Sequence, residues 1–187
     1  MPYLASLPED AGPPHVFKQY PDIYGPFSEM SEALMNGPSP LSQAERELIL
    51  AYAAGVSGNR FVLTGHAAVA YARGIEPGLL DRLLGAEGTA AAGAKLAPLL
   101  DFVRKLMLSP AEMAPSDAAA VFAAGWDEAA LHGAVAIAGR AAFMHRLVAG
   151  CGFNPLDPEV ARSHAQKRVE KGYVNIYKAF RKPATEG

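Results

Sequence analysis

The sequence predicts an all-α fold, a helical bundle that forms a single domain. The chain has 187 residues, a length that fits one domain, and half of its residues are hydrophobic. Alanine, the residue with the highest helix propensity, is abundant, whereas runs of Val, Ile and Thr are few. Apolar residues also recur at helical spacing, most clearly over residues 95–108, at Leu96, Leu99, Leu100 and Val103.

The domain divides into three parts: an N-terminal arm with a short helix (residues 1–40), a helical core (41–156), and a C-terminal helix with a tail (157–187). The arm is rich in proline, which predicts extended chain with turns and a short helix near residues 15–20. Its aromatic side chains predict that it packs on the body of the protein or on a neighbouring subunit. A helix over residues 27–35 follows and stops at Gly37-Pro38.

Residues 41–74 predict two helices joined by a tight corner. Ser42 is a good N-cap, and Glu45, three residues later, completes a capping box. Gly58 ends the first helix because glycine tolerates the left-handed conformation that a helix C-terminus needs. The second helix continues to Gly74.

Proline, glycine and capping residues predict the remaining elements. In chain order these are a short helix from Glu76-Pro77 to about residue 84, a small and flexible segment over 85–93, the amphipathic helix over 95–108, a loop over 110–115, a short helix that Ser116 or Asp117 caps and that ends at Gly125, a long helix over 128–149 that Asp127 caps, and a final polar helix from Pro158 to Lys171, which residues 173–180 extend.

Composition and charge exclude several classes of protein. The net charge is −2 and no basic patch is interleaved with aromatic residues, so we expect no nucleic-acid partner. The N-terminal residues lack the basic start and apolar core of a signal peptide, and no convincing membrane-spanning stretch is present. The single cysteine, Cys151, excludes an intramolecular disulfide. We therefore expect a cytoplasmic protein without a membrane partner.

Glu47 and His66 are the best candidates for catalytic residues. They lie about ten residues before the corner and about eight after it, so at about 1.5 Å per residue they reach similar heights in an antiparallel hairpin. A carboxylate and an imidazole that both face inward form the arrangement that general acid–base catalysis needs. The structural alternative is that Glu47 pairs with a nearby arginine and that His66 is a hydrogen-bonded core histidine.

The same stretch resembles the carboxymuconolactone decarboxylase and AhpD-like alkylhydroperoxidase superfamily, in its peroxidase-related branch. The shared pattern is a Glu-Arg-Glu-Leu helix that contains Glu47, a small-Gly corner, and a histidine, His66, four residues after the second position of a Cys-x-x-Cys motif. Asn59 and Val62 occupy the two cysteine positions, so the thiol redox cycle is not available at this site. The resemblance covers roughly residues 17–156 and implies an AhpD-like bundle that assembles as a homo-oligomer, a trimer or hexamer.

Three further residues are candidates for substrate binding. Asn59 either caps the second helix of the hairpin or binds a substrate oxygen there. Arg140 and His145 lie on a long alanine-rich helix and need polar partners, which are either intersubunit contacts or an anionic substrate. Glu128 and His132 share a helix face, but no third ligand has recognisable spacing, so we expect neither a metal nor a cofactor.

These residues leave three functions open. The first is an enzyme in which Glu47 and His66 perform acid–base chemistry on a small carboxylate, lactone or related carbonyl compound. The second is a thiol peroxidase that uses Cys151 alone. The third is a non-catalytic oligomeric binding protein with a collapsed, dry site between Glu47 and His66. The resemblance itself implies an oxidoreductase or a decarboxylase-like lyase.

Overall fold

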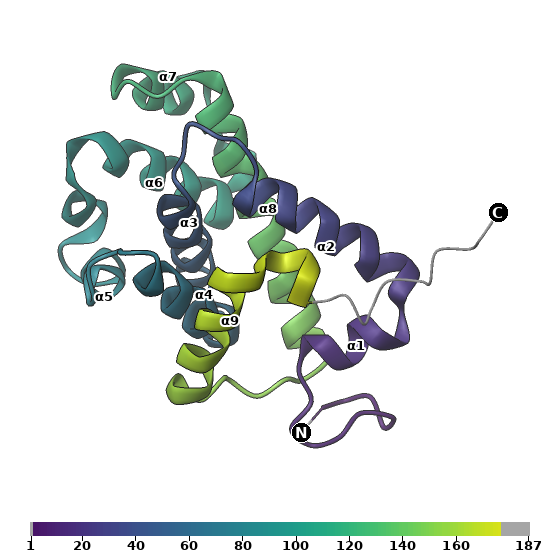
Figure 1. Cartoon of the computed structure of the whole chain (residues 1–187). Helices are drawn as coiled ribbons and strands as arrows, with labels where there is room; N and C mark the ends of the chain where they lie inside the picture. The colour runs from purple at the N-terminus through teal and green to yellow at the C-terminus, as the bar shows by residue number, and fades with distance from the viewer. Residues whose placement is uncertain (1, 177–187) are drawn as a thin grey trace.

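The structure, a computed structural model, describes residues 2–176, and within this range it consists of helices and their connections (Figure 1). This confirms the predicted all-α fold. No helix in the described range is both long and apolar enough to cross a membrane. The helices are α1 (Pro13–Gln19), α2 (Pro21–Asn36), α3 (Gln43–Val56), α4 (Arg60–Ala72), α5 (Leu79–Leu84), α6 (Gly93–Leu108), α7 (Pro115–Ala123), α8 (Glu128–Gly150) and α9 (Pro158–Ile176), with short 3-10 helices at Gly88–Ala92 and Pro110–Glu112.

Helix α3 runs through the centre of the bundle and is surrounded by other helices (Figure 1). Every residue from Arg46 to Ala54 is buried, so this part of the helix has no face in contact with water. Helix α4 packs along α3 as the second half of the hairpin, α8 and α6 pack against α3, and α9 packs against α4. The carboxylate of Glu47 is therefore held in the core, where it needs partners from the protein.

The ends of α3 and α4 lie where the sequence predicts them. Ser42 Oγ accepts a hydrogen bond from the Glu45 N–H (3.2 Å), and the Glu45 carboxylate accepts one from the Ser42 N–H (2.7 Å), which forms the predicted capping box. Gly58 follows α3 with φ of 76°, and Gly74 follows α4 with φ of 97°. Both values lie in the left-handed region that glycine adopts without steric cost.

The N-terminal arm is more helical than its proline content predicts. Pro13 and Pro21 each stand at the first position of a helix, where the missing N–H would have had no intrahelical partner. These prolines therefore begin α1 and α2, and α2 is longer than the helix expected over residues 27–35. The arm packs on its own chain, because Phe17 is buried in the core and stacks on Tyr24 with ring centroids 4.3 Å apart.

Two segments in the middle of the chain also differ from expectation. Helix α5 begins at Leu79 rather than beside Pro77, because Gly78 adopts φ of 85° and interrupts the chain between them. Residues 85–93, predicted to be flexible, contain a 3-10 helix.

Asp127 caps α8 as predicted, since its carboxylate accepts a hydrogen bond from a backbone N–H of the first turn.

Helix α9 continues past Lys171 but kinks at Gly172, where φ is 68° and ψ is −171°. The predicted extension of this helix is therefore present as far as Ile176, and the rest of it, residues 177–180, lies outside the described residues. After the kink, the last part of α9 runs toward α2 (Figure 1).

Candidate active site

Glu47 and His66 meet in the middle of the α3–α4 hairpin. Glu47 Oε2 lies 2.7 Å from His66 Nδ1. Glu47 is fully buried and His66 is 7% exposed. The two residues proposed as a catalytic pair are therefore in direct contact, in surroundings from which water is largely excluded.

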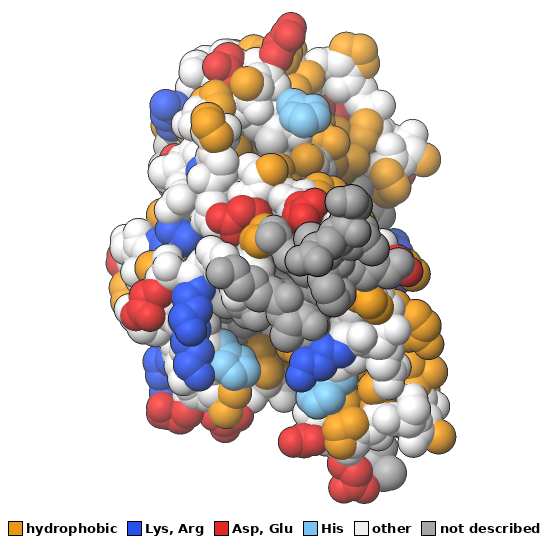
Figure 2. All heavy atoms as spheres, turned by 45° about the vertical axis from the view of Figure 1, so that its right-hand side comes forward, with side chains coloured by type: hydrophobic (Ala, Val, Ile, Leu, Met, Phe, Trp, Pro, Cys, Tyr) orange, Lys and Arg blue, Asp and Glu red, His pale blue; other side chains and the backbone are white. Residues whose placement is uncertain are grey.

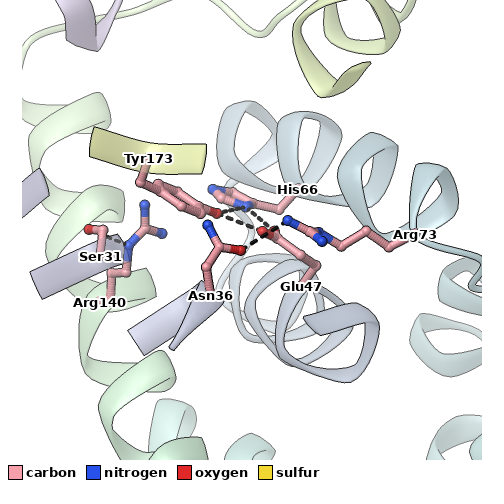
Figure 3. A network of polar contacts seen from close by, with 7 residues as sticks. All are labelled: Ser31, Asn36, Glu47, His66, Arg73, Arg140 and Tyr173. Carbon is pink, nitrogen blue, oxygen red and sulfur yellow. Dashed lines mark hydrogen bonds and ion pairs between the residues drawn. The ribbon is translucent and has the colours of Figure 1, made fainter. Parts of the chain in front are cut away.

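Tyr173 joins this pair from α9. Its hydroxyl donates a hydrogen bond of 2.7 Å to Glu47 Oε1, and its ring lies nearly parallel to the imidazole of His66 (Figure 3). Each carboxylate oxygen of Glu47 thus has one side-chain partner. Sequence reasoning did not identify Tyr173 as a site residue, because it follows a glycine near the end of a polar helix and no local pattern links it to the hairpin.

Nearby arginines do not pair with Glu47 in this chain. Arg46 donates to the backbone carbonyls of Leu34 (3.0 Å) and Gly37 (2.9 Å). Arg73 donates to Asn36 Oδ1 (2.9 Å), as Figure 3 shows, and also to a side-chain oxygen on α3. Within the described residues, the carboxylate therefore interacts with a histidine and a tyrosine rather than with an arginine on its own helix or on α4.

The protonation states of the pair follow from burial and charge. Burial lowers the pKa of His66 to about 4 against the opposing effect of Glu47, and the charges of two nearby arginines lower it further. Burial alone would raise the pKa of Glu47, but the contacts with His66 and Tyr173 and the charge of Arg168 bring it below its usual value. At neutral pH the pair is a carboxylate and a neutral imidazole. The carboxylate accepts the Nδ1–H, which leaves the lone pair on Nε2 of His66.

A cavity of about 530 Å³ lies beside His66. The N-terminal arm, α4, α8, the loop over residues 154–157 and α9 form its walls. A cavity of this size is in the usual range for small-molecule sites. Its apolar lining comes from Phe17, Phe27, Phe61, Val62, Met144, Leu156 and Val160, and its basic or imidazole side chains are His15, His66, Arg140, His164 and Arg168.

Arg140 lines the same cavity and is 5% exposed. Its Nε donates a hydrogen bond of 2.9 Å to Ser31 Oγ. Its guanidinium carbon lies 4.9 Å from the Tyr173 ring centroid and 5.5 Å from that of Phe27. One of the three substrate-binding candidates thus lies on the cavity that His66 borders.

The other two candidates lie elsewhere. Asn59 Oδ1 accepts a hydrogen bond from the Val62 N–H (3.0 Å), so its side chain caps α4, and it does not line the cavity beside His66. His145 lines a separate cavity of about 520 Å³, together with Ser57 and Arg146. Neither residue lines the cavity that His66 borders.

Cys151 also lies outside the cavity beside His66. Burial raises the pKa of its thiol, whereas a reactive cysteine needs a lowered one. Within residues 2–176, no group of three or more His, Cys, Asp or Glu side chains is placed to hold a metal ion.

The fold is that of AhpD-like, peroxidase-related proteins, which confirms the resemblance seen in the sequence at the level of the fold. An uncharacterized peroxidase-related protein from Silicibacter sp. TM1040 matches with a TM-score of 0.68 and 24% identity, over 75% of each chain. The alkylhydroperoxidase AhpD core of an uncharacterized peroxidase-related protein from Ralstonia eutropha JMP134 matches with a TM-score of 0.66 and 20% identity, over 77% of each chain. The sequence matches no profile of a known protein family and no curated protein.

Proposed function

We propose that this protein is an enzyme that uses His66 as a general base on a small carboxylate or carbonyl compound. The observation that carries the proposal is the 2.7 Å contact between Glu47 and His66 at the wall of a cavity of about 530 Å³. The carboxylate fixes the tautomer of the imidazole and stabilises the imidazolium that forms when the base takes a proton. Proton transfer of this kind contributes on the order of 10²–10⁴ in rate.

The proposed reaction is a proton transfer in which residues on the cavity act as the base and stabilise the charge that develops. A C–H bond next to the substrate carbonyl breaks, its proton forms an N–H bond on His66 Nε2, and the electron pair moves onto the carbonyl oxygen. The buried cation of Arg140, on the same cavity, stabilises that negative charge. Return of the proton from His66 to the same or a neighbouring atom completes the turnover.

The geometry favours this function over the two alternatives. A thiol peroxidase that uses Cys151 alone needs an activated thiol, and burial acts in the opposite direction there. A binding protein with a vestigial site predicts a collapsed, dry space between Glu47 and His66, whereas His66 lines a cavity with an apolar lining.

The test is exchange of acidic C–H protons for deuterium, followed by NMR in deuterated buffer over a panel of small carbonyl compounds and carboxylates. We expect exchange with the wild type and with Cys151→Ser, and a loss of at least about 100-fold in His66→Gln. His145→Gln is the matched control, since His145 borders a different cavity. Equal exchange by His66→Gln, or no exchange by the wild type on any compound, would contradict the proposal.

A further inference from the structure

We infer that Arg140 is the anchor of an anion-binding site, and that its ligand is a monocarboxylate with an apolar body, such as an arylalkyl or alkyl carboxylate. The inference deepens the proposed function, because it names the class of substrate that reaches His66. The binding step is nevertheless independent of the chemistry and can be tested without it.

The cation of Arg140 is buried and lacks a counter-ion among the described residues. None of the ion pairs in the described part of the chain involves Arg140. The two acidic side chains on the cavity, Asp10 and Asp157, do not contact it, and Asp157 instead accepts backbone N–H groups at the start of α9. A buried charge is costly unless it is paired, so an anion is the expected occupant of the space in front of it.

The polar contacts of Arg140 leave one part of its guanidinium ready for a ligand. Ser31 Oγ donates its own hydrogen to the Phe27 carbonyl (2.7 Å) and can therefore only accept from Arg140 Nε. This bond fixes the orientation of the guanidinium, which lies near the Tyr173 ring (Figure 3) and near the Phe27 ring. Within the described residues, the buried Nη1 has no hydrogen-bond partner. An unpaired buried donor on a residue that lines a cavity is a feature that a carboxylate oxygen would satisfy.

The rest of the cavity favours an apolar ligand body over a simple inorganic anion. Around Arg140 the lining is formed largely by aromatic and aliphatic side chains, among them Phe17, Phe61 and Met144. Burial of an apolar group against such a wall is favourable in proportion to its area. Acetate or phosphate alone would leave this wall uncovered.

The surface charge on the face in Figure 2 does not by itself select an anion. On the face in Figure 2, Lys or Arg side chains and histidines lie among acidic side chains rather than in a purely basic patch. The preference for an anion therefore comes from the buried cation of Arg140. Arg168 lines the same cavity, and its guanidinium lies over the Tyr173 ring.

The test is calorimetric titration of three carboxylates (benzoate, phenylacetate and hexanoate) and their neutral amides into the wild type, Arg140→Met and Arg146→Met. At least one carboxylate should bind saturably to the wild type, at least about 10-fold more tightly than its amide. Arg140→Met should weaken that carboxylate at least about 10-fold and leave the amide unchanged. Arg146 is exposed on the same helix and lines the other cavity, so Arg146→Met should bind like the wild type.

Three results would overturn the inference: no saturable binding of any carboxylate, equal affinity for acid and amide, or full affinity in Arg140→Met. Arg140→Met should fold, because it replaces an uncompensated buried charge with an apolar side chain of similar length. Arg140→Lys is the second variant, and it should bind the carboxylate with intermediate affinity since it retains the charge without the planar fork.

The same titration separates this inference from the proposed function. His66→Gln should retain carboxylate binding while it loses proton exchange. Binding by the wild type without any exchange would support the anion site and contradict the proposed chemistry. Exchange that survives in Arg140→Met with unchanged kcat and KM would contradict the anion site and the charge stabilisation by Arg140, and would leave His66 as the base.

Discussion

At the scale of single residues, the site is organised by the need to satisfy one buried carboxylate. Glu47 lies on a helix that is buried all around, so neither of its oxygens can rely on water. His66 supplies a donor to one oxygen and Tyr173 to the other, at 2.7 Å in each case. Burial and the charge of Glu47 raise the pKa of Tyr173, so its hydroxyl keeps its proton and remains a donor.

Tyr173→Phe tests this arrangement with the loss of one oxygen atom. Without the hydroxyl, Glu47 Oε1 loses its side-chain donor, which should cost about 1–3 kcal/mol of unfolding free energy. Since that hydrogen bond lowers the pKa of Glu47, the variant should raise it. Urea denaturation and the pH dependence of proton exchange measure the two effects. Tyr71→Phe, at a half-buried tyrosine outside the cavity, is the control. Unchanged stability and an unchanged pH profile in Tyr173→Phe would show that the hydroxyl contributes nothing.

At the scale of elements, the kink in α9 positions Tyr173. Gly172 has φ of 68° and ψ of −171°, a combination that is essentially restricted to glycine. Immediately after it, the Glu32 carboxylate of α2 accepts the backbone N–H groups of Tyr173 and Val174. This carboxylate supplies the first amides after the kink with an acceptor, which fixes the direction in which the tyrosine enters the core.

Gly172→Ala should therefore disturb the site without changing any residue in it. A Cβ at this position would lie 2.6 Å from a Glu32 carboxylate oxygen, so the carboxylate would have to leave its backbone partners. Backbone strain and the lost hydrogen bonds together should cost about 2–4 kcal/mol of unfolding free energy and reduce exchange as Tyr173→Phe does.

Gly88→Ala is the matched control for that variant. Gly88 also has positive φ (60°), but no atom lies within 4 Å of the added Cβ. It should lose only about 1 kcal/mol and retain full exchange. Equal effects of the two substitutions would mean that the contact with Glu32 does not position Tyr173.

The elements also show what sequence reasoning can and cannot predict here. The hairpin was predictable because a capping box and a corner glycine act within a few residues, and the contact between Glu47 and His66 followed from equal heights in that hairpin. The role of Tyr173 was not predictable, since its partner Glu47 is 126 positions away in the sequence. Its approach to Glu47 also depends on a kink in α9 that α2 holds in place. Arg140 was recognisable as a charge that needs a partner, but its direction depends on how α8 packs.

At the scale of the whole molecule, the resemblance implies a homo-oligomer, and we propose that α2 takes part in the contact between copies. Ile23 and Met30 are seven residues apart on α2, and Phe143 of α8 contacts Phe27 between them. These three exposed side chains are each 42–59% exposed, which indicates an apolar surface suited to a second copy of the chain.

We expect light scattering to give the mass of a trimer or hexamer, and the double variant Ile23→Glu, Met30→Glu to shift it toward the monomer. Phe122→Glu, at an exposed phenylalanine on α7, should leave the mass unchanged. A monomeric wild type would contradict the prediction.

The buried histidine should also make the stability of the whole fold depend on pH. The pKa of His66 is about 4 in the folded protein and 6.5 in an unfolded chain, so between these values the unfolded state binds a proton that the folded state does not. Folding is thus favoured above pH 6.5, and this contribution is lost as the pH falls toward 4. It amounts to about 3 kcal/mol at most.

Since other acidic groups change in the same direction at low pH, the informative quantity is the difference in unfolding free energy between the wild type and His66→Gln. This difference should shrink by up to about 3 kcal/mol between pH 7 and pH 4. His132→Gln removes a histidine outside the site and should leave the wild-type slope intact. A constant difference between the wild type and His66→Gln across this range would mean that His66 takes up its proton as readily in the folded protein as in the unfolded chain, and that burial does not lower its pKa.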